Sequence, residues 1–202
     1  MCGGAMDEGL RLVLDELLAA GREHDAHEAI HARRLLNLEV ATAQLMAILI
    51  QNGRRTRVLE IGTSNGYSAI WLAWALRPLG GHLTSIERDG AKQAAADANL
   101  RRVGLREVVT LREGDATTVV AELAGPFDCV FFDADRRSAP DQLRLLLPKL
   151  TDDALLLCDN VLSHPAEVAE YLAAVDALPD YQQVVVPIGK GLSVAHRLGR
   201  ES

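Results

Sequence analysis

From residue 57 onward, short apolar runs rich in β-branched and aromatic residues alternate with segments of helical period, and this alternation leaves few possible folds. The runs RVLEIG, HLTSIE and FDCVFFDAD are typical of buried strands, whereas the segments between them repeat apolar residues three and four positions apart. Strands that alternate with helices build a mainly parallel sheet with helices on both faces. We therefore predict an α/β fold.

The pattern also predicts the order of the elements. Expected strands lie in RVLEIG, HLTSIE, EVVTLREG, FDCVFFDAD, ALLLCDN, YQQVVVPIG and LSVAHRL. Expected helices lie at about 10–20, 35–50, 67–77, 90–103, 117–124, 140–150 and 165–177. Only about four residues separate the last two strands, which is too few for a parallel crossover, so these strands predict an antiparallel hairpin at a sheet edge. We expect a single domain, residues 1–202, with an N-terminal helical extension (about 1–54) before the α/β core (about 55–198).

Charge and composition exclude several classes of partner. The net charge of −7 disfavours a nucleic acid or an anionic membrane, which would require a basic face. No apolar run reaches about 18 residues, so we expect no membrane span, and the first ten residues lack the pattern of a signal peptide. Cys2, Cys129 and Cys158 lack the spacing of metal ligands, and Cys129 and Cys158, which lie in apolar strand-like runs, are expected to be small buried hydrophobic residues in a reducing compartment. These features predict a cytoplasmic location.

The first β–α turn, in VLEIGTSNGYSAIWLA, is the expected ligand site, because ligands of open α/β sheets lie beyond the carboxyl ends of the strands. Gly62 and Gly66 permit close approach of a ligand to the backbone. Their spacing is G-x-x-x-G, not the G-x-G-x-x-G that binds a pyrophosphate. This difference argues against a nicotinamide oxidoreductase and favours a small ligand without a diphosphate.

Three acidic residues mark the same edge. Glu60 interrupts an apolar strand, and its carboxylate needs partners in the loop or on a ligand. Glu87 ends the second strand, where it can accept hydrogen bonds from both hydroxyls of a ribose or remain a solvated strand-end acid. Asp115 ends the third strand, where it can meet an adenine amino group, cap the following helix, or do both.

The fourth and fifth strands end in further polar residues. Asp133 follows one strand, and Asp159 and Asn160 follow the next. Two carboxylates and an amide oxygen above one crevice suit Mg²⁺ or a similar ion. The same residue types also cap helices, so the residues alone leave a metal site and a pair of caps open.

Three histidines, His24, His27 and His31, lie three and four residues apart. This spacing places them on one face of an expected helix. Because charged residues are interspersed among them, we expect a solvated helix face rather than a metal site.

Five segments in order, VLEIGTSNGYSAIWLA, TSIERD, VTLREGDA, FDCVFFDAD and LLLCDNVL, resemble the S-adenosylmethionine-dependent O-methyltransferases of the catechol and caffeoyl-CoA type. The resemblance runs from about residue 24 to residue 197. It implies a Rossmann-like class I methyltransferase fold with seven strands, six of them parallel and one antiparallel. It further implies S-adenosylmethionine and a divalent cation such as Mg²⁺ as cofactors, a small hydroxylated acceptor, and a homodimer.

The resemblance also assigns residues. It implies a cofactor site formed by Leu38, Glu60, Gly62, Ser64, Ser68, Glu87, Asp115, Ala116 and Asp133. In this site Leu38 covers the cofactor, Ser68 contacts the methionine carboxylate, and Glu87 holds the ribose. Asp133 faces both the methionine ammonium and the metal, and its metal shell is completed by Asp159 and Asn160.

Arg136 departs from the family, which often carries a lysine three residues after the first metal aspartate. A guanidinium stays protonated and cannot act as a base, but Arg136 can stabilise an oxyanion. The hydroxyl proton would then leave to water or to His164. Two alternatives stay open: a metal-independent methyltransferase in which Arg136 steers an anionic acceptor, and a cofactor-binding protein without catalytic activity.

Overall fold

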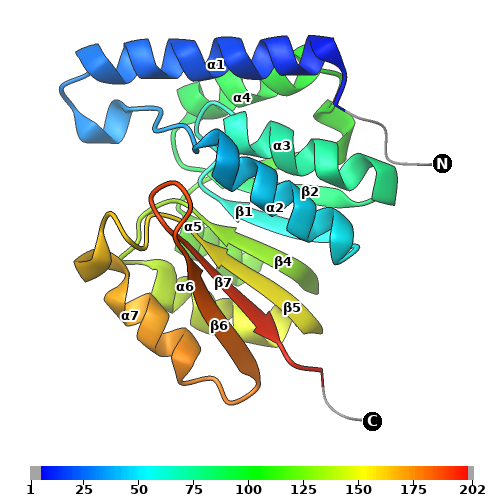
Figure 1. The fold of residues 1–202 in the computed structure, drawn as a ribbon, viewed down its shortest axis with the longest axis vertical. Coiled ribbons are helices and arrows are strands. Elements are labelled where there is room, and N and C mark those ends of the chain that lie inside the picture. Colours follow the sequence, from blue (N-terminus) through cyan, green and yellow to red (C-terminus); the bar gives the residue numbers. More distant parts are fainter. Residues whose placement is uncertain (1–5, 200–202) are drawn as a thin grey trace.

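The computed structural model describes residues 6–199, apart from the side chain of Ala32, so Cys2 lies outside the described residues. A seven-stranded sheet forms the centre of the molecule (Figure 1). Its strands are β1 (Arg57–Ile61), β2 (His82–Glu87), β3 (Val109–Glu113), β4 (Phe127–Phe132), β5 (Leu150–Cys158), β6 (Tyr181–Val186) and β7 (Leu192–Arg197). All seven strands agree with the pattern in the sequence.

The strand order is β3-β2-β1-β4-β5-β7-β6. The first five strands in this order pair in parallel, whereas β7 is antiparallel to both of its neighbours, β5 and β6. This arrangement confirms the α/β fold and the antiparallel edge hairpin. Because the parallel strands share one direction, their carboxyl ends meet at a single edge of the sheet.

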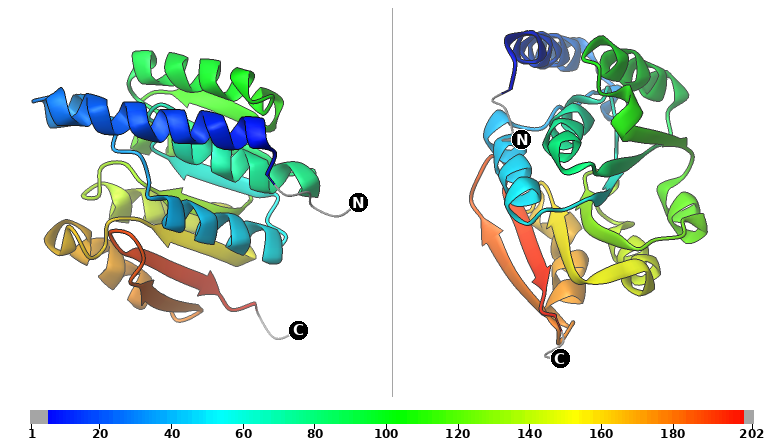
Figure 2. Two further views of the ribbon diagram at one scale, coloured as in Figure 1. Left: turned by 45° about the horizontal axis from the view of Figure 1, so that its top comes forward. Right: turned by 90° about the vertical axis from the view of Figure 1, so that its right-hand side faces the viewer.

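Helices cover both faces of the sheet, as Figure 2 shows. They are α1 (Glu8–His27), α2 (Val40–Asn52), α3 (Tyr67–Leu76), α4 (Gly90–Arg102), α5 (Ala116–Glu122), α6 (Ala139–Leu146) and α7 (Pro165–Asp176). Helices α1 to α4 pack on one face and α5 to α7 on the other. None of these helices, within the part of the chain that the structure describes, has the length and apolar character that crossing a bilayer requires.

The strands supply both cores because their side chains alternate between the two faces. In β1, Val58 packs with α1 to α4, whereas Leu59 and Ile61 pack with α5 to α7. A parallel sheet that is covered on both faces has apolar residues at successive positions, which is the continuous pattern of these runs. Within β1, Glu60 interrupts this pattern, and its carboxyl group is fully buried.

The N-terminal region differs from the prediction. Helix α1 continues to His27, and α2 begins only at Val40, so the expected helix over 35–50 was wrong in its first turn. Residues 28–39, which we call the strap, cross between the two helices with little regular structure. The reason is local, since both carboxylate oxygens of Asp25 accept backbone hydrogen bonds from Leu35 and Leu36 (2.7 and 2.9 Å), and Leu36 adopts a left-handed φ of 51°.

Two other expectations are corrected. The histidines do not share one helix face, because α1 ends at His27 and His31 lies beyond it in a short 3₁₀ turn. The helix expected over 140–150 ends at Leu146, and β5 already begins at Leu150. Pro148 explains the early end, because it has no N–H with which to continue the α-helical ladder.

Candidate active site

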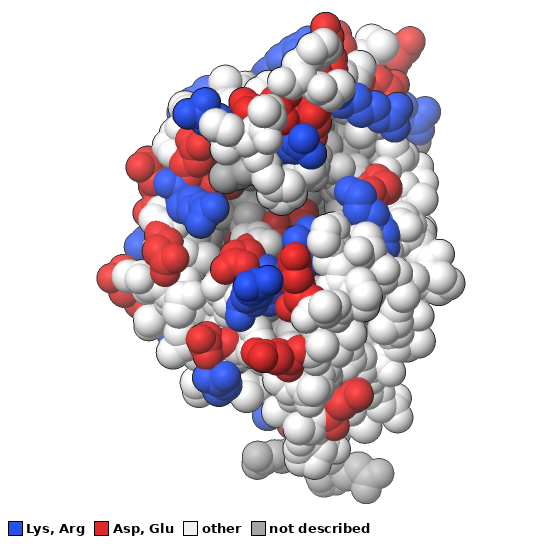
Figure 3. Space-filling model, turned by 90° about the vertical axis from the view of Figure 1, so that its left-hand side faces the viewer, with Lys and Arg blue, Asp and Glu red and all other residues white. Residues whose placement is uncertain are grey.

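The carboxyl ends of β1, β2, β4 and β5 form one edge of the sheet, over which the strap and the β6–β7 loop pass (Figure 1). Seen from this side, the surface is hollowed near its middle, with acidic and basic side chains next to one another around the hollow (Figure 3). Most of the predicted site residues lie at this edge.

The loop after β1, residues 62–66, is called the glycine loop here. Gly62 has a φ of 109°, and a Cβ atom at this position would lie 2.4 Å from the carbonyl oxygen of Asp133. Gly66 also has a positive φ, 86°, and packs against Ala96 of α4. Both glycines are therefore required by the backbone: Gly62 lets the ends of β1 and β4 approach, and Gly66 lets α3 start beside α4.

Glu87, the last residue of β2, fixes the glycine loop by a hydrogen bond. Its Oε2 atom accepts a hydrogen bond from the backbone N–H of Ser64 (2.8 Å), and its Oε1 atom accepts one from Asp89 (3.0 Å). The Ser64 hydroxyl donates in turn to the carbonyl of Leu35 in the strap (2.8 Å). Glu87, the residue predicted to bind the ribose, thus lies half-buried where the glycine loop, β2 and the strap meet.

Glu60 lies beneath the loop. Its Oε2 atom accepts a hydrogen bond from the Ser85 hydroxyl (2.5 Å), which also contacts the Thr63 hydroxyl (2.5 Å). The Oε1 atom is buried and has no hydrogen-bond partner among the described residues. Burial raises the pKa of Glu60 from 4.5 to about 7, although the nearby Ser68 and Ser85 hydroxyls act in the opposite direction. Ser68, in the first turn of α3, is itself buried.

Asp115 caps α5. Its Oδ1 atom accepts hydrogen bonds from the backbone N–H of Thr118 (3.0 Å) and from the Thr118 hydroxyl (3.2 Å). The backbone hydrogen bond from Thr118 is the main cause that lowers the pKa of Asp115. The residue remains exposed beside half-buried Ala116. The cap is therefore present, and a contact with adenine at the same residue stays a prediction.

The predicted metal ligands do come together. The side-chain amide nitrogen of Asn160 donates to Oδ2 of Asp159 (2.8 Å) and to Oδ1 of Asp133 (3.3 Å). Asn160 adopts a left-handed φ of 67°, which turns its side chain back toward the two carboxylates. We call these three residues the acidic cluster.

The acidic cluster concentrates negative charge in a buried place. Burial, together with the neighbouring carboxylates of Asp159 and Glu60, raises the pKa of Asp133 well above its usual range. Burial also raises the pKa of Asp159, from 3.8 to about 6, and the Glu39 carboxylate adds to this rise. Two carboxylates this close disfavour each other's ionised form unless a cation joins them.

A divalent cation fits this donor set. Asp159 Oδ1 is buried without a hydrogen-bond partner in the described part of the chain, and hard oxygen donors are what Mg²⁺ prefers. Rotation of the Asn160 amide would direct its oxygen, instead of its nitrogen, toward the carboxylates. No group of three or more His, Cys, Asp or Glu side chains within residues 6–199 has the arrangement of a metal site, so the cluster offers two carboxylates and one amide.

Arg136 and His164 lie beside the cluster. The Arg136 Nη1 atom forms an ion pair with Oε2 of Glu167 in α7 (3.1 Å), and its positive charge lowers the pKa of Asp133. His164 precedes α7, as its place before Pro165 predicted, and its Nδ1 atom contacts the Ser163 hydroxyl (2.9 Å). This ion pair uses Nη1, whereas Nε of Arg136 is buried without a hydrogen-bond partner among the described residues.

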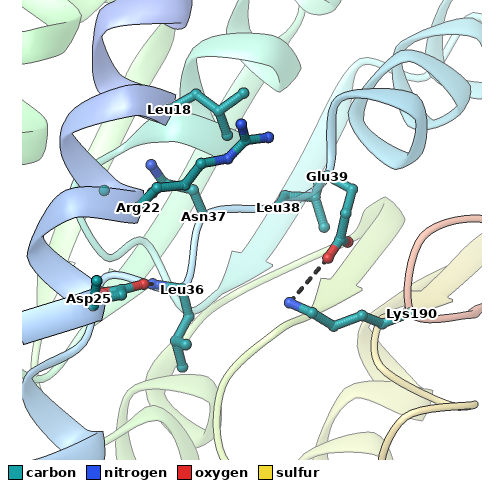
Figure 4. Close-up of a pocket in the computed structure, with 10 residues that line it drawn as sticks. Leu18, Arg22, Asp25, Leu36, Asn37, Leu38, Glu39 and Lys190 are labelled. Atoms are coloured by element: carbon teal, nitrogen blue, oxygen red, sulfur yellow. Dashed lines mark hydrogen bonds and ion pairs between the residues drawn. The ribbon is translucent and has the colours of Figure 1, made fainter. Parts of the chain in front are cut away.

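The strap and the β6–β7 loop add a pocket where the sequence leads us to expect one, between the N-terminal helices and the hairpin, although the sequence did not identify its residues. It has a volume of about 420 Å³ and lies between α1, the strap and Lys190 (Figure 4). Leu38, the predicted cofactor cover, is buried in its wall. Lys190 forms an ion pair with Glu39 (Nζ–Oε1, 2.9 Å) across the pocket. This pair joins residues 151 positions apart, and no local signal in the sequence links them.

Comparison with known proteins identifies the family. The model of a methyltransferase domain family matches residues 59–161. A catechol O-methyltransferase of Niastella koreensis is 36% identical over 123 residues, which cover 59% of this chain and 55% of that protein. A catechol O-methyltransferase of Mycobacterium tuberculosis is 36% identical over 115 residues, covering 56% and 52%. The chain thus spans about half the length of these two relatives.

A solved structure matches nearly the whole chain. It is the O-methyltransferase TomG of Streptomyces achromogenes, described as involved in tomaymycin synthesis and solved in complex with S-adenosylmethionine. The two structures superpose with a TM-score of 0.80 at 26% identity, covering 96% of this chain and 92% of TomG. The similarity therefore includes the N-terminal helices and the C-terminal hairpin as well as the family core.

Proposed function

The chain belongs to the methyltransferase domain family, and we propose that it transfers a methyl group from S-adenosylmethionine to a hydroxyl oxygen of a small acceptor. The observation that carries the proposal is one edge of the sheet that gathers Glu60, the glycine loop, Glu87 and the acidic cluster. Both catechol O-methyltransferases and the S-adenosylmethionine complex of TomG support it by similarity.

In this proposal the glycine loop and its neighbours bind the cofactor. Glu87 holds the ribose, and Asp115 with Ala116 borders the adenine. Ser64 and Ser68 lie toward the methionine end, beneath the cover of Leu38. The unpartnered oxygen of buried Glu60 supports a cationic ligand above it, because a buried carboxylate without partners is costly. The ammonium group of the cofactor has the required charge.

The acidic cluster would hold the cation. Asp133, Asp159 and Asn160 would supply its protein ligands, and the remaining positions would be open to water and to two oxygens of the acceptor. We therefore infer an acceptor with two adjacent oxygens, such as a catechol or another vicinal diol. When bound, the cofactor supplies an electrophilic methyl group and the cation supplies Lewis-acid activation of a hydroxyl.

The chain's own residues position the reactants. In the proposed transfer, the acceptor oxygen would form a bond to the methyl carbon, the carbon–sulfur bond would break with its electron pair on sulfur, and the hydroxyl proton would leave to water. Holding acceptor and cofactor in line accounts for much of the rate. Arg136 lies next to Asp133 and stabilises negative charge on the acceptor electrostatically. Because Glu167 already pairs with Arg136, steering of an anionic acceptor by Arg136 alone is the weaker alternative.

The test is a panel of phenols, catechols and sugar-like diols, with release of S-adenosylhomocysteine as the readout, with Mg²⁺ and with a chelator. Turnover of vicinal diols that the chelator abolishes is expected. Turnover that persists in the chelator would contradict the metal and favour the metal-independent alternative. Cofactor binding without turnover on any member would favour a non-catalytic protein.

The predicted homodimer and cytoplasmic location stay predictions. Light scattering coupled to gel filtration measures the first directly, and a molecular mass of one chain would contradict it.

A further inference from the structure

The pocket beside the active site is lined by two basic and two acidic side chains. Four charged side chains line it: Arg22, Asp25, Glu39 and Lys190 (Figure 4). Both oxygens of Asp25 are committed to backbone N–H groups of the strap (2.7 and 2.9 Å), so this carboxylate serves the fold. Glu39 and Lys190 pair only with each other across the pocket in the part of the chain described. This pair is therefore free to exchange one partner for a ligand.

Lys190 is fixed directly beside the acidic cluster. The backbone carbonyl of Lys190 accepts hydrogen bonds from the N–H groups of Leu162 (3.0 Å) and Ser163 (3.1 Å), in the turn that follows Asp159 and Asn160. Gly191 has a φ of 92°, and a Cβ atom there would lie 2.5 Å from the side chain of Leu162. The loop is thus pressed onto the turn, and the Lys190 side chain both lines the pocket and acts by its charge on Asp133 and Asp159.

Lys190 is the only lysine in a position to act there. The chain has three lysines. The Lys92 ammonium donates to the carbonyl of Arg34 in the strap (2.6 Å), and the Lys149 ammonium donates to carbonyls of α5 on the other face of the sheet (2.7 and 2.8 Å). Of the three lysines, Lys190 is the one that lines the pocket, where Arg22 supplies the second positive charge, and the charge of Lys190 lowers the pKa of both Asp133 and Asp159.

Unsatisfied hydrogen-bonding groups close to Glu39 could accommodate its carboxylate if it left Lys190. It lies directly before α2, yet its side chain makes no capping hydrogen bond to that helix. Its Oε2 atom and the hydroxyl of Thr42 are both buried without partners in the described chain. A Cβ atom on Gly189 would lie 2.8 Å from this oxygen and 2.5 Å from this hydroxyl, so the two unsatisfied groups flank the same glycine. A released Glu39 would find a donor in Thr42 and in the uncapped end of α2.

We propose that Lys190 binds an anionic group of the acceptor, of which a carboxylate is the simplest, and that Glu39 occupies this place until the acceptor binds. The inference rests on the proposed methyl transfer and adds a substrate class to it. The acceptor then carries two adjacent oxygens for the cluster and a negative charge at the pocket wall. Glu39 is a positioning residue that keeps the ammonium in place, and its carboxylate competes with that of the acceptor.

The experiment uses two ligands that differ only in charge: catechol, and protocatechuate, which is catechol with one added carboxylate. Each is titrated by calorimetry into protein saturated with S-adenosylhomocysteine and Mg²⁺. The wild type is expected to bind protocatechuate about tenfold more tightly than catechol, the size of one charge-assisted contact. Equal affinities would overturn the proposal.

Substitutions of Lys190 and of Glu39 are expected to change the preference for protocatechuate over catechol in opposite directions. Lys190→Met is expected to abolish the preference while leaving catechol affinity within about twofold, and Lys190→Arg keeps it. Glu39→Gln is expected to increase the preference, because it removes the competing charge. A merely structural ion pair would make Lys190→Met and Glu39→Gln act alike, and that result would overturn the proposal. Lys149→Met is the matched control and leaves the preference unchanged.

Turnover distinguishes this inference from the proposed function. A wild type that binds protocatechuate preferentially, but releases no S-adenosylhomocysteine with any diol, would contradict methyl transfer and leave the anion site standing. A wild type that methylates both ligands with the same KM would contradict the anion site alone.

Discussion

The glycine loop and the acidic cluster follow neighbouring strands, yet they differ in how far their polar groups are satisfied. In the loop, the N–H groups of Gly62 and Thr63 donate to the carbonyl of Ile86 (3.0 and 3.2 Å), and that of Ser64 donates to Glu87 (2.8 Å). In the cluster, two buried carboxylates share one amide, and an oxygen of Asp159 has no partner in the described chain.

This difference shows which part of the site is complete without ligand. The loop has its final backbone conformation, because its hydrogen bonds are internal to the sheet edge. In the cluster, burial raises the pKa of both carboxyl groups, and the carboxylates of Asp159 and Glu39 add to the rise at Asp133 and at Asp159 respectively, despite the nearby positive charges of Arg136 and Lys190. We infer that the cofactor meets a preformed surface, whereas the acidic cluster is completed by a cation.

The largest expected effect is on the cluster. Asp159→Ala removes a proposed cation ligand and is expected to reduce turnover with a vicinal diol about a thousandfold, or about 4 kcal/mol in transition-state stabilisation. Asp152→Ala is the control, because this exposed carboxylate lies on β5 far from its carboxyl end and makes only a long ion pair with Arg197 (3.8 Å). Comparable turnover in both variants would remove the cluster from the chemistry.

On the loop side, Gly62→Ala is expected to lower the free energy of unfolding by about 3 kcal/mol, because the methyl group meets the Asp133 carbonyl and the φ is strained. Gly80→Ala provides the matched control: its φ is also positive, 64°, but an added Cβ atom would have no heavy atom of the described residues within 4 Å beyond those of its chain neighbours, so a loss of about 1 kcal/mol is expected. Urea unfolding measures both, and equal losses would show that the loop is not tightly packed.

Glu60 lies beneath the glycine loop and raises the pKa of Asp133 in the acidic cluster, and its own titration makes the stability of the protein depend on pH. Its folded pKa of about 7 exceeds the ordinary 4.5, so the folded state binds the proton more tightly than the unfolded state does. The stability from this group is fully present below pH 4.5 and is lost as the pH rises through 7, a total of about 3 kcal/mol.

Glu60→Gln is therefore expected to be more stable than the wild type at pH 8 and equal to it near pH 4, since glutamine resembles the protonated acid. Urea unfolding across this range measures the difference. A constant difference at all pH values would contradict the raised pKa.

The smallest effect is expected for Glu87→Ala, which removes the proposed ribose contact and two backbone hydrogen bonds. S-adenosylmethionine affinity should fall about tenfold, or about 1.4 kcal/mol. Glu113→Ala, at the same register position of β3, is the control and should leave the affinity unchanged. Unchanged affinity in the Glu87 variant, measured by calorimetry, would refute the ribose role.

The sequence predicted the strands of the α/β core more accurately than the N-terminal strap. Strands covered on both faces have a continuous apolar pattern, and their ends therefore locate Glu87, Asp133 and Asp159 without ambiguity. The family and fold predictions are confirmed by the matching family model and the sheet order. The strap was missed because the carboxylate of Asp25 unwinds the chain at Leu35 and Leu36, which the apolar period of that stretch does not reveal.

Long-range pairs were the other failure. The partner of Arg136 is Glu167 and the partner of Lys190 is Glu39, and in both cases tertiary packing, not spacing, brings the charges together. Such pairs determine which charges remain available to an acceptor. They therefore affect specificity most in the region where sequence patterns are least informative.

The most direct test is calorimetric titration of Mg²⁺ into protein saturated with S-adenosylhomocysteine, compared between the wild type and Asp159→Asn. We predict one saturable site in the wild type that the substitution removes, while cofactor binding persists. A wild type that binds no Mg²⁺, or a variant that binds it equally well, would contradict the assignment of the acidic cluster.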